Sequence, residues 1–169
     1  MYGKALALAP DDVEVLNGLV RANTLIGDYD EALSWGKRVI EVTKSERAWW
    51  VEALKKPGIS PQEEPTCRRT IKSLGKLEAY THLNSYTILA TSDSFEAALK
   101  HLSRASELDS TNAALYSRRA ELLVDLGRHA EALTAIDSYL SRTEDTFESE
   151  DVRRAFQLRA ACQAAIASD

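Results

Sequence analysis

The residues of this sequence that could act chemically are few and scattered. His82, His101 and His129 follow no metal-binding spacing, and Ser73 and Lys76 form an isolated S-x-x-K tetrapeptide without its companion motifs. The two cysteines lie 95 positions apart, which is too few for a disulfide framework and the wrong arrangement for zinc. No glycine-rich phosphate loop occurs. We therefore expect no catalytic site, no metal and no cofactor.

Composition narrows the class of partner. The chain has 169 residues, which suits one domain or one compact repeat array, and its net charge of −5 would repel a phosphate backbone. No stretch approaches the ~20 apolar residues that a membrane span needs. With only Cys67 and Cys162, a reducing compartment is the default. We expect a cytoplasmic protein with a protein or peptide partner, no nucleic acid and no membrane insertion.

Positive charge gathers in one part of the chain. This basic cluster consists of Lys55, Lys56, Arg68, Arg69, Lys72 and Lys76, interrupted by Glu63 and Glu64. Two interpretations are open: a solvated helix face, which is the commoner case, or a site for an acidic partner.

Helix signals recur 34 positions apart. Ala5 and Val39 have this spacing, as do Ala105 and Tyr139, and the pattern G-x-x-x-E-A-L occurs at 27–33 and again at 127–133. A glycine before an acidic helix start, with a small alanine inside the helix, predicts stacked helical hairpins at this period. Such stacks are binding surfaces far more often than catalysts. The spacing therefore predicts a binding function without naming the partner.

Apolar periodicity predicts helices throughout and no strands. The first two span 13–26 and 29–42, with Asp12 and Asp28 as their N-terminal caps. The rhythm then breaks into a short helix from Ser45 to Lys56 and a Pro-rich loop over 57–65. The remaining helices are expected at about 66–76, loosened at Gly75, then near 78–91, 94–108, 113–126 and 129–141, and from Ser149 onward.

Small and apolar residues recur at matching positions of three hairpins. They are Leu16, Leu19, Val20, Ala32 and Val39 in 13–46, Tyr86, Leu89, Ala98, Leu102 and Ala105 in 79–112, and Tyr116, Ala120, Leu123, Ala132 and Ile136 in 113–146. The hairpins resemble tetratricopeptide repeats, whose pattern is W-x2-L-G-x2-Y followed by A-x3-F, A and P. Gly36, where a large residue is expected, and Tyr139, where a small one is expected, depart from it.

The resemblance implies an all-α, right-handed superhelical solenoid of antiparallel helix hairpins that forms a single domain over 1–169. Its units would be a half repeat 1–12, a repeat 13–46, an irregular repeat 47–78 containing the 57–65 loop, repeats 79–112 and 113–146, and a capping helix 149–167. The half repeat suggests the hypothesis that the chain is part of a longer array.

In this family the first helix of each hairpin lines a concave groove. By analogy, the groove would bind an extended peptide or a partner helix. Any single residue that lines such a groove is more often merely solvated. The candidate residues are Asn17, Arg21, Thr24, Tyr80, Asn84, Thr87, Ser117, Arg118 and Glu121.

The resemblance leaves two alternatives open. Asn84 and Arg118 coincide with carboxylate-binding positions of the chaperone-binding adaptors of the family, although Ala114 stands where a lysine belongs. The chain would then be a co-chaperone-type adaptor that recognises an acidic C-terminus. It could instead be a structural or oligomerisation segment of a larger multi-subunit assembly.

Trp49 and Trp50 are adjacent, so on a helix they point roughly 100° apart and cannot both face one core. Either one is buried and the other partly exposed, or the exposed ring is an anchor for a second interface beside the Pro-rich loop.

Overall fold

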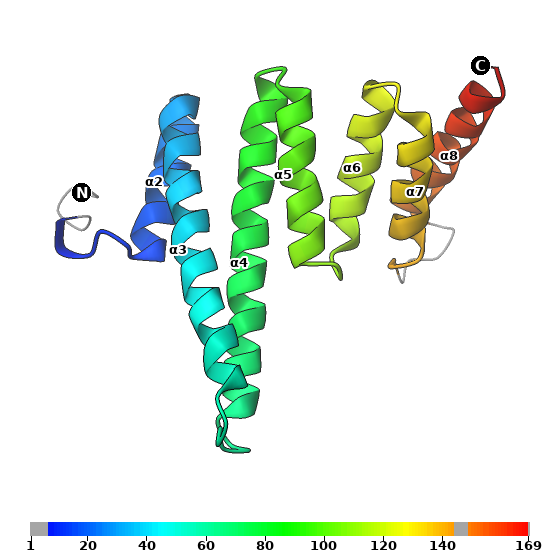
Figure 1. Cartoon of the computed structure of the whole chain (residues 1–169). Helices are drawn as coiled ribbons and strands as arrows, with labels where there is room; N and C mark the ends of the chain where they lie inside the picture. The colour runs from blue at the N-terminus through cyan, green and yellow to red at the C-terminus, as the bar shows by residue number, and fades with distance from the viewer. Residues whose placement is uncertain (1–6, 144–148, 169) are drawn as a thin grey trace.

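The computed structural model describes residues 7–143 and 149–168, which contain helices and no strand (Figure 1). The first six residues of the predicted half repeat 1–12 lie outside these residues. The all-α expectation is confirmed. The helices are α2 (Val13–Ile26), α3 (Tyr29–Lys55), α4 (Glu64–Thr91), α5 (Phe95–Leu108), α6 (Ala113–Asp125), α7 (His129–Leu140) and α8 (Glu150–Ser168).

Local sequence signals set the first helix boundaries as predicted. The Asp12 carboxylate accepts hydrogen bonds from the backbone N–H groups of Glu14 and Val15, at 2.8 and 3.1 Å. Asp28 caps α3 in the same way, at 3.2 Å from the N–H of Glu31. Gly27 ends α2 with φ of 79°, a left-handed conformation that glycine adopts without a steric penalty.

Consecutive helices pack against each other in chain order from α2 to α8. Each apolar stripe is therefore buried by its sequence neighbours, as in a one-dimensional stack. The last helix, α8, packs mainly on α7 and presents mostly polar residues on its outer side. The buried residues fall into three clusters, centred on Leu16, Val20 and Val39, on Leu102, Ala105 and Leu115, and on Leu123, Ile136 and Cys162.

The predicted helix breaks near residues 43–44 and 75–77 are wrong. α3 runs without interruption to Lys55, and α4 is continuous from Glu64 to Thr91. No proline or positive-φ residue occurs at 43–44 or at 75–77, so nothing stops helix propagation at the two predicted breaks. Gly75 is buried inside α4, and a Cβ on it would lie 3.8 Å from the Leu108 carbonyl oxygen. This is an ordinary contact distance, and α4 continues through Gly75 without a break.

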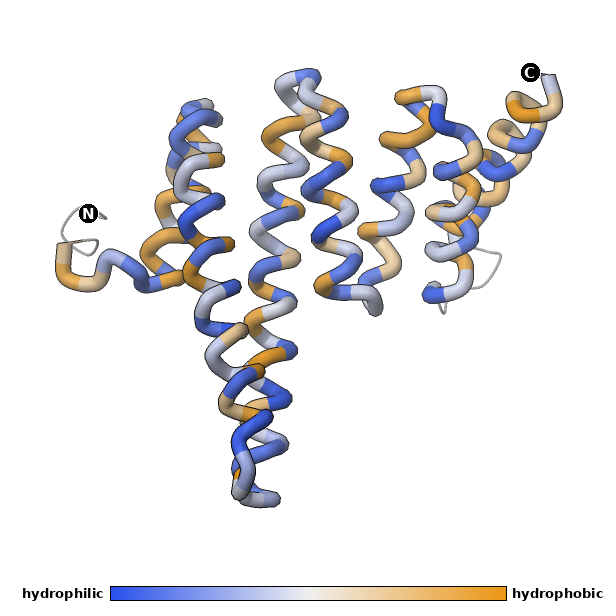
Figure 2. Tube along the Cα trace, in the orientation of Figure 1, coloured by the Kyte–Doolittle hydropathy of each residue, from blue (hydrophilic) through white to orange (hydrophobic). Residues whose placement is uncertain are grey.

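The two long helices form a hairpin that projects beyond the rest of the stack (Figure 1). The loop between them covers 56–63, and Pro65 lies in the first turn of α4, where its missing N–H is not needed. Figure 2 shows that the loop end of this hairpin is mostly hydrophilic. The projecting part thus extends past the other helices of the stack.

A buried carboxylate joins three helices where the projecting part meets the stack. Glu78 of α4 is 1% exposed, and its Oε2 accepts hydrogen bonds from Nε and Nη2 of Arg47, on α3, at 3.2 and 2.9 Å. Its Oε1 lies 3.6 Å from Nη2 of Arg104, on α5. The ion-pair cluster fixes α3, α4 and α5 relative to one another.

Two histidines meet between α4 and α5. The Nδ1 atoms of His82 and His101 lie 3.0 Å apart and the ring centroids 5.0 Å apart. Burial lowers the pKa of both imidazoles. For His82, the neighbouring His101 and Arg104 add to this effect and Glu107 opposes it, which gives a pKa of about 4. The folded protein therefore favours the neutral form of both rings.

We expect the chain to lose thermal stability as the pH falls from about 6.5 towards 4. Between these values the unfolded chain binds protons at positions 82 and 101 that the folded chain does not bind. The melting temperature of His82→Gln should therefore fall less than that of the wild type between neutral and mildly acidic pH. Parallel curves for the two proteins would contradict this prediction, because carboxylate titration is common to both.

Candidate partner-binding surfaces

A cleft of about 250 Å³ lies between α2 and α4. The two helices belong to successive hairpins, so the cleft is a product of stacking and not of one repeat alone. It is lined by Val20, Arg21, Thr24 and Leu25 from α2 and by Tyr80, Asn84, Thr87 and Ile88 from α4.

The floor of this cleft is apolar and its edges are accessible. Val20 and Ile88 are each 3% exposed, whereas Tyr80 is 52% and Leu25 85% exposed. Pockets for small molecules usually enclose about 300–1,000 Å³. The smaller volume here suits one apolar side chain of a peptide or helix better than it suits a small molecule.

The polar groups at the edge differ in how far they are already engaged. The hydroxyls of Thr24 and Thr87 donate to the carbonyl oxygens of Val20 and Leu83, at 2.8 and 3.1 Å. The side chains of Arg21 and Asn84 have no hydrogen-bond or ion-pair partner among the described residues. The guanidinium and carboxamide groups therefore remain free to bind a carboxylate or a peptide group.

The structure divides the predicted groove. It brings Arg21, Thr24, Tyr80, Asn84 and Thr87 into this cleft. The predicted site residues do not include the apolar lining residues Val20, Leu25 and Ile88. The repeat pattern places Val20 in the packing between helices. The apolar Leu25 at the end of an amphipathic helix is a signal in the sequence that could identify it as a lining residue. We keep the binding role of all these residues as a prediction.

The other predicted residues lie elsewhere. Ser117 and Glu121 line a small pocket against α8, where Glu121 Oε1 lies 3.1 Å from Nη2 of Arg154. Asn17 is half-buried in α2, away from the cleft lining, and its buried Oδ1 has no hydrogen-bond partner among the described residues. Arg118 is exposed on α6.

Arg118 and Glu121 lie close to Tyr86 of α4. Burial raises the pKa of the Tyr86 phenol, with smaller contributions from Glu121 and Asp125, while Arg118 lowers it. Asn84 lines the α2–α4 cleft but Arg118 does not. The two residues that resemble a carboxylate site thus do not share this cleft, and their role in binding a carboxylate stays a prediction.

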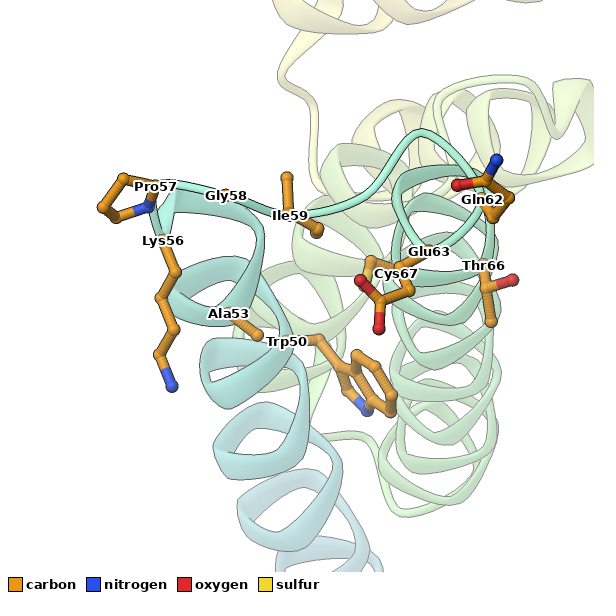
Figure 3. A pocket seen from close by; sticks show the side chains of 10 residues that line it. All are labelled: Trp50, Ala53, Lys56, Pro57, Gly58, Ile59, Gln62, Glu63, Thr66 and Cys67. Atoms are coloured by element: carbon orange, nitrogen blue, oxygen red, sulfur yellow. The ribbon is translucent and has the colours of Figure 1, made fainter.

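A second cavity, of about 550 Å³, opens at the loop end of the long hairpin. In Figure 3, Trp50 and Ala53 of α3 face Thr66 and Cys67 of α4, and the 56–59 segment crosses between the two helices. This volume lies within the range of ligand pockets.

The two tryptophans serve different surfaces, as their adjacent positions predict. Trp50 is half-buried in the loop-end cavity, whereas Trp49 is 60% exposed and lines a shallow hollow with Asp11, Arg38 and Glu46. The two rings still contact each other edge to face, with centroids 4.9 Å apart. An interface role for either ring stays a prediction.

The described ranges 7–143 and 149–168 contain no group of three or more His, Cys, Asp or Glu side chains that could hold a metal ion. No helix in the same ranges is long and apolar enough to cross a membrane.

Comparison with known proteins gives consistent matches. Family models of the tetratricopeptide repeat match residues 1–48 and 89–162. Tetratricopeptide repeat protein 8 of Caenorhabditis elegans is 26% identical over 152 residues, covering 88% of this chain and 30% of that protein. The chain thus spans less than a third of this relative's length.

Solved structures share the fold. The complex of the TPR2B domain of yeast Sti1 with an Hsp70 peptide matches with a TM-score of 0.56 at 16% identity, covering 90% of this chain and 96% of that one. MamA matches with a TM-score of 0.54 at 19% identity, covering 97% and 80%. The period, the stacked hairpins and both family models agree, and the chain belongs to the tetratricopeptide repeat family.

Proposed function

We propose that this chain is a non-catalytic protein-interaction module, a scaffold or adaptor that binds a peptide or helical segment of a partner protein in the α2–α4 cleft. The observation that carries the proposal is the combination of an apolar floor with the unpaired side chains of Arg21 and Asn84. The floor accepts one apolar anchor, and the two polar groups orient the backbone or a carboxylate beside it.

The comparisons support this class of function. The Sti1 structure is that of a repeat domain in complex with a peptide, and it shares the fold of this chain. The buried free thiols of Cys67 and Cys162 fit the reducing environment of the cytoplasm, where we place the protein. Its matched relative is much longer, so we propose that the module acts within a larger protein or complex.

The cleft is tested with a library of phage-displayed peptides selected on the wild-type chain. Selected peptides are then measured by fluorescence anisotropy against Tyr80→Ala and Asn84→Ala. We expect Tyr80→Ala to weaken binding by about tenfold or more, because an exposed aromatic ring at the cleft edge is a typical hot spot. Asn84→Ala should have a smaller effect in the same direction.

Tyr29→Ala is the matched control, since Tyr29 is also an exposed tyrosine but lies outside the cleft. It should bind the selected peptides like the wild type. Selection of no peptide, or equal binding to all variants, would refute the cleft as the site. Amidation of the peptide C-terminus in the same assay decides whether a terminal carboxylate is recognised.

A further inference from the structure

One row of cations follows the outer face of α4 in the projecting part of the hairpin. Arg69, Lys72 and Lys76 are spaced by three and four residues, so they share one face of the helix. All three are exposed, while the buried residues Cys67 and Leu74 lie on the opposite face of the same helix. We call this row the basic ridge.

No carboxylate neutralises the basic ridge. Glu64 binds Arg68 at 2.7 Å, and Glu78 is buried with Arg47. The cap residue Glu63 accepts a hydrogen bond from the Ser60 N–H at 3.1 Å, which helps to lower the pKa of its carboxyl. The two acidic residues of α4 and the one that precedes it, Glu64, Glu78 and Glu63, thus each have a partner. None of the three ridge cations forms an ion pair with a described residue.

The structure therefore divides the basic cluster of the sequence into paired cations, the unpaired ridge cations and Lys56, which lines the loop-end cavity. Lys55 and Arg68 are paired within their own helices, with Glu52 and Glu64, both at 2.7 Å. The ridge cations are not paired, although like charges three and four residues apart destabilise a helix. A row of three unpaired cations on a chain of net charge −5 indicates a surface whose positive charge is neutralised by another molecule.

We propose that the basic ridge binds an acidic segment of a partner protein. Its cations run from Arg69 to Lys76, seven steps along the helix or about 10 Å. An extended peptide advances ~6.6 Å every two residues, so carboxylates at three alternate positions cover ~13 Å, and the long side chains of arginine and lysine can bridge this difference. A nucleic acid would continue past the ridge onto a chain that is negative overall, whereas a short acidic segment ends where the positive charge ends.

This inference goes beyond the proposed function and does not rest on it. The ridge lies outside the α2–α4 cleft, which begins one helical turn beyond Lys76, at Tyr80. Binding at the ridge and binding in the cleft can therefore be lost separately.

The test uses a short fluorescein-labelled peptide of alternating glutamate and alanine, with an alternating glutamine–alanine peptide as the neutral probe. By fluorescence anisotropy, the wild type should bind the acidic peptide at about 50 mM salt, weaken at about 300 mM, and ignore the neutral one. The variant Arg69→Glu/Lys72→Glu/Lys76→Glu should lose about tenfold or more in affinity. If the glutamate variant fails to fold, the triple alanine variant at the same positions replaces it. This variant should also bind the acidic peptide more weakly than the wild type.

The matched control is Lys37→Glu/Lys44→Glu/Arg153→Glu, which changes the same residue types and the same net charge at exposed, unpaired positions elsewhere. It should keep the wild-type affinity, and so should Tyr80→Ala. Equal losses in both triple variants would show a mere effect of net charge and overturn the proposal. No binding by the wild type would overturn it too, as would ridge-dependent binding of a short thymidine oligonucleotide or of phosphatidylserine vesicles that exceeds binding of the peptide.

Discussion

Replacing Glu78 with alanine is expected to lower the free energy of unfolding by about 3–5 kcal/mol. The substitution leaves Arg47, whose side chain is only 25% exposed, without the carboxylate that accepts two hydrogen bonds from its guanidinium group. It also removes the contact of α4 with Arg104 of α5, although Arg104 keeps Glu107 at 2.8 Å. Urea unfolding followed by circular dichroism measures the change.

A double replacement separates loss of the ion pair from loss of packing. Arg47→Met/Glu78→Leu removes both charges and fills their space with apolar atoms, and it should recover most of the stability that Glu78→Ala loses. Glu78→Gln should lie between the wild type and alanine, since it keeps the shape but not the charge. A loss below about 1 kcal/mol for Glu78→Ala would show that this cluster does not hold the three helices together.

The sequence predicts the regular helices well because their signals are local. Asp12, Asp28 and Gly27 act at the boundaries where they stand in the chain, and the 34-residue period correctly indicated stacked hairpins. The sequence alone does not predict that α3 continues beyond residue 42. Whether a helix continues there depends on the partner helix beside it, and pairing of α3 with α4 along their length is a tertiary property.

The candidate site was predicted in part for the same reason. Helix spacing places Tyr80, Asn84 and Thr87 on one face of α4, and they do line one cleft. Spacing carries no information about α8, which covers Glu121 through Arg154. The i,i+4 spacing of Glu64 and Arg68 does account for their ion pair, whereas Arg69, five residues from Glu64, lies on another face of the helix.

Gly36 should tolerate alanine but not leucine. It is buried in α3 where this helix crosses α4, and a Cβ at this position would lie 3.5 Å from Ser85 Oγ and 3.9 Å from Thr81 Cγ2. Those are ordinary contacts, so Gly36→Ala should raise the free energy of unfolding by up to about 1 kcal/mol through its better helix propensity. Gly36→Leu forces the helices apart and should lower it by about 1–3 kcal/mol or more.

Ser34→Leu is the control for the added side chain, because Ser34 is exposed on the same helix and leucine there crowds no neighbour. It should change the unfolding free energy little, and a loss equal to that of Gly36→Leu would mean that close packing at Gly36 is not the cause. If Gly36→Leu spreads α3 and α4, it should also weaken binding of selected peptides in the α2–α4 cleft, because α2 is held by α3. Binding of the acidic peptide should persist, since the basic ridge lies on α4 alone.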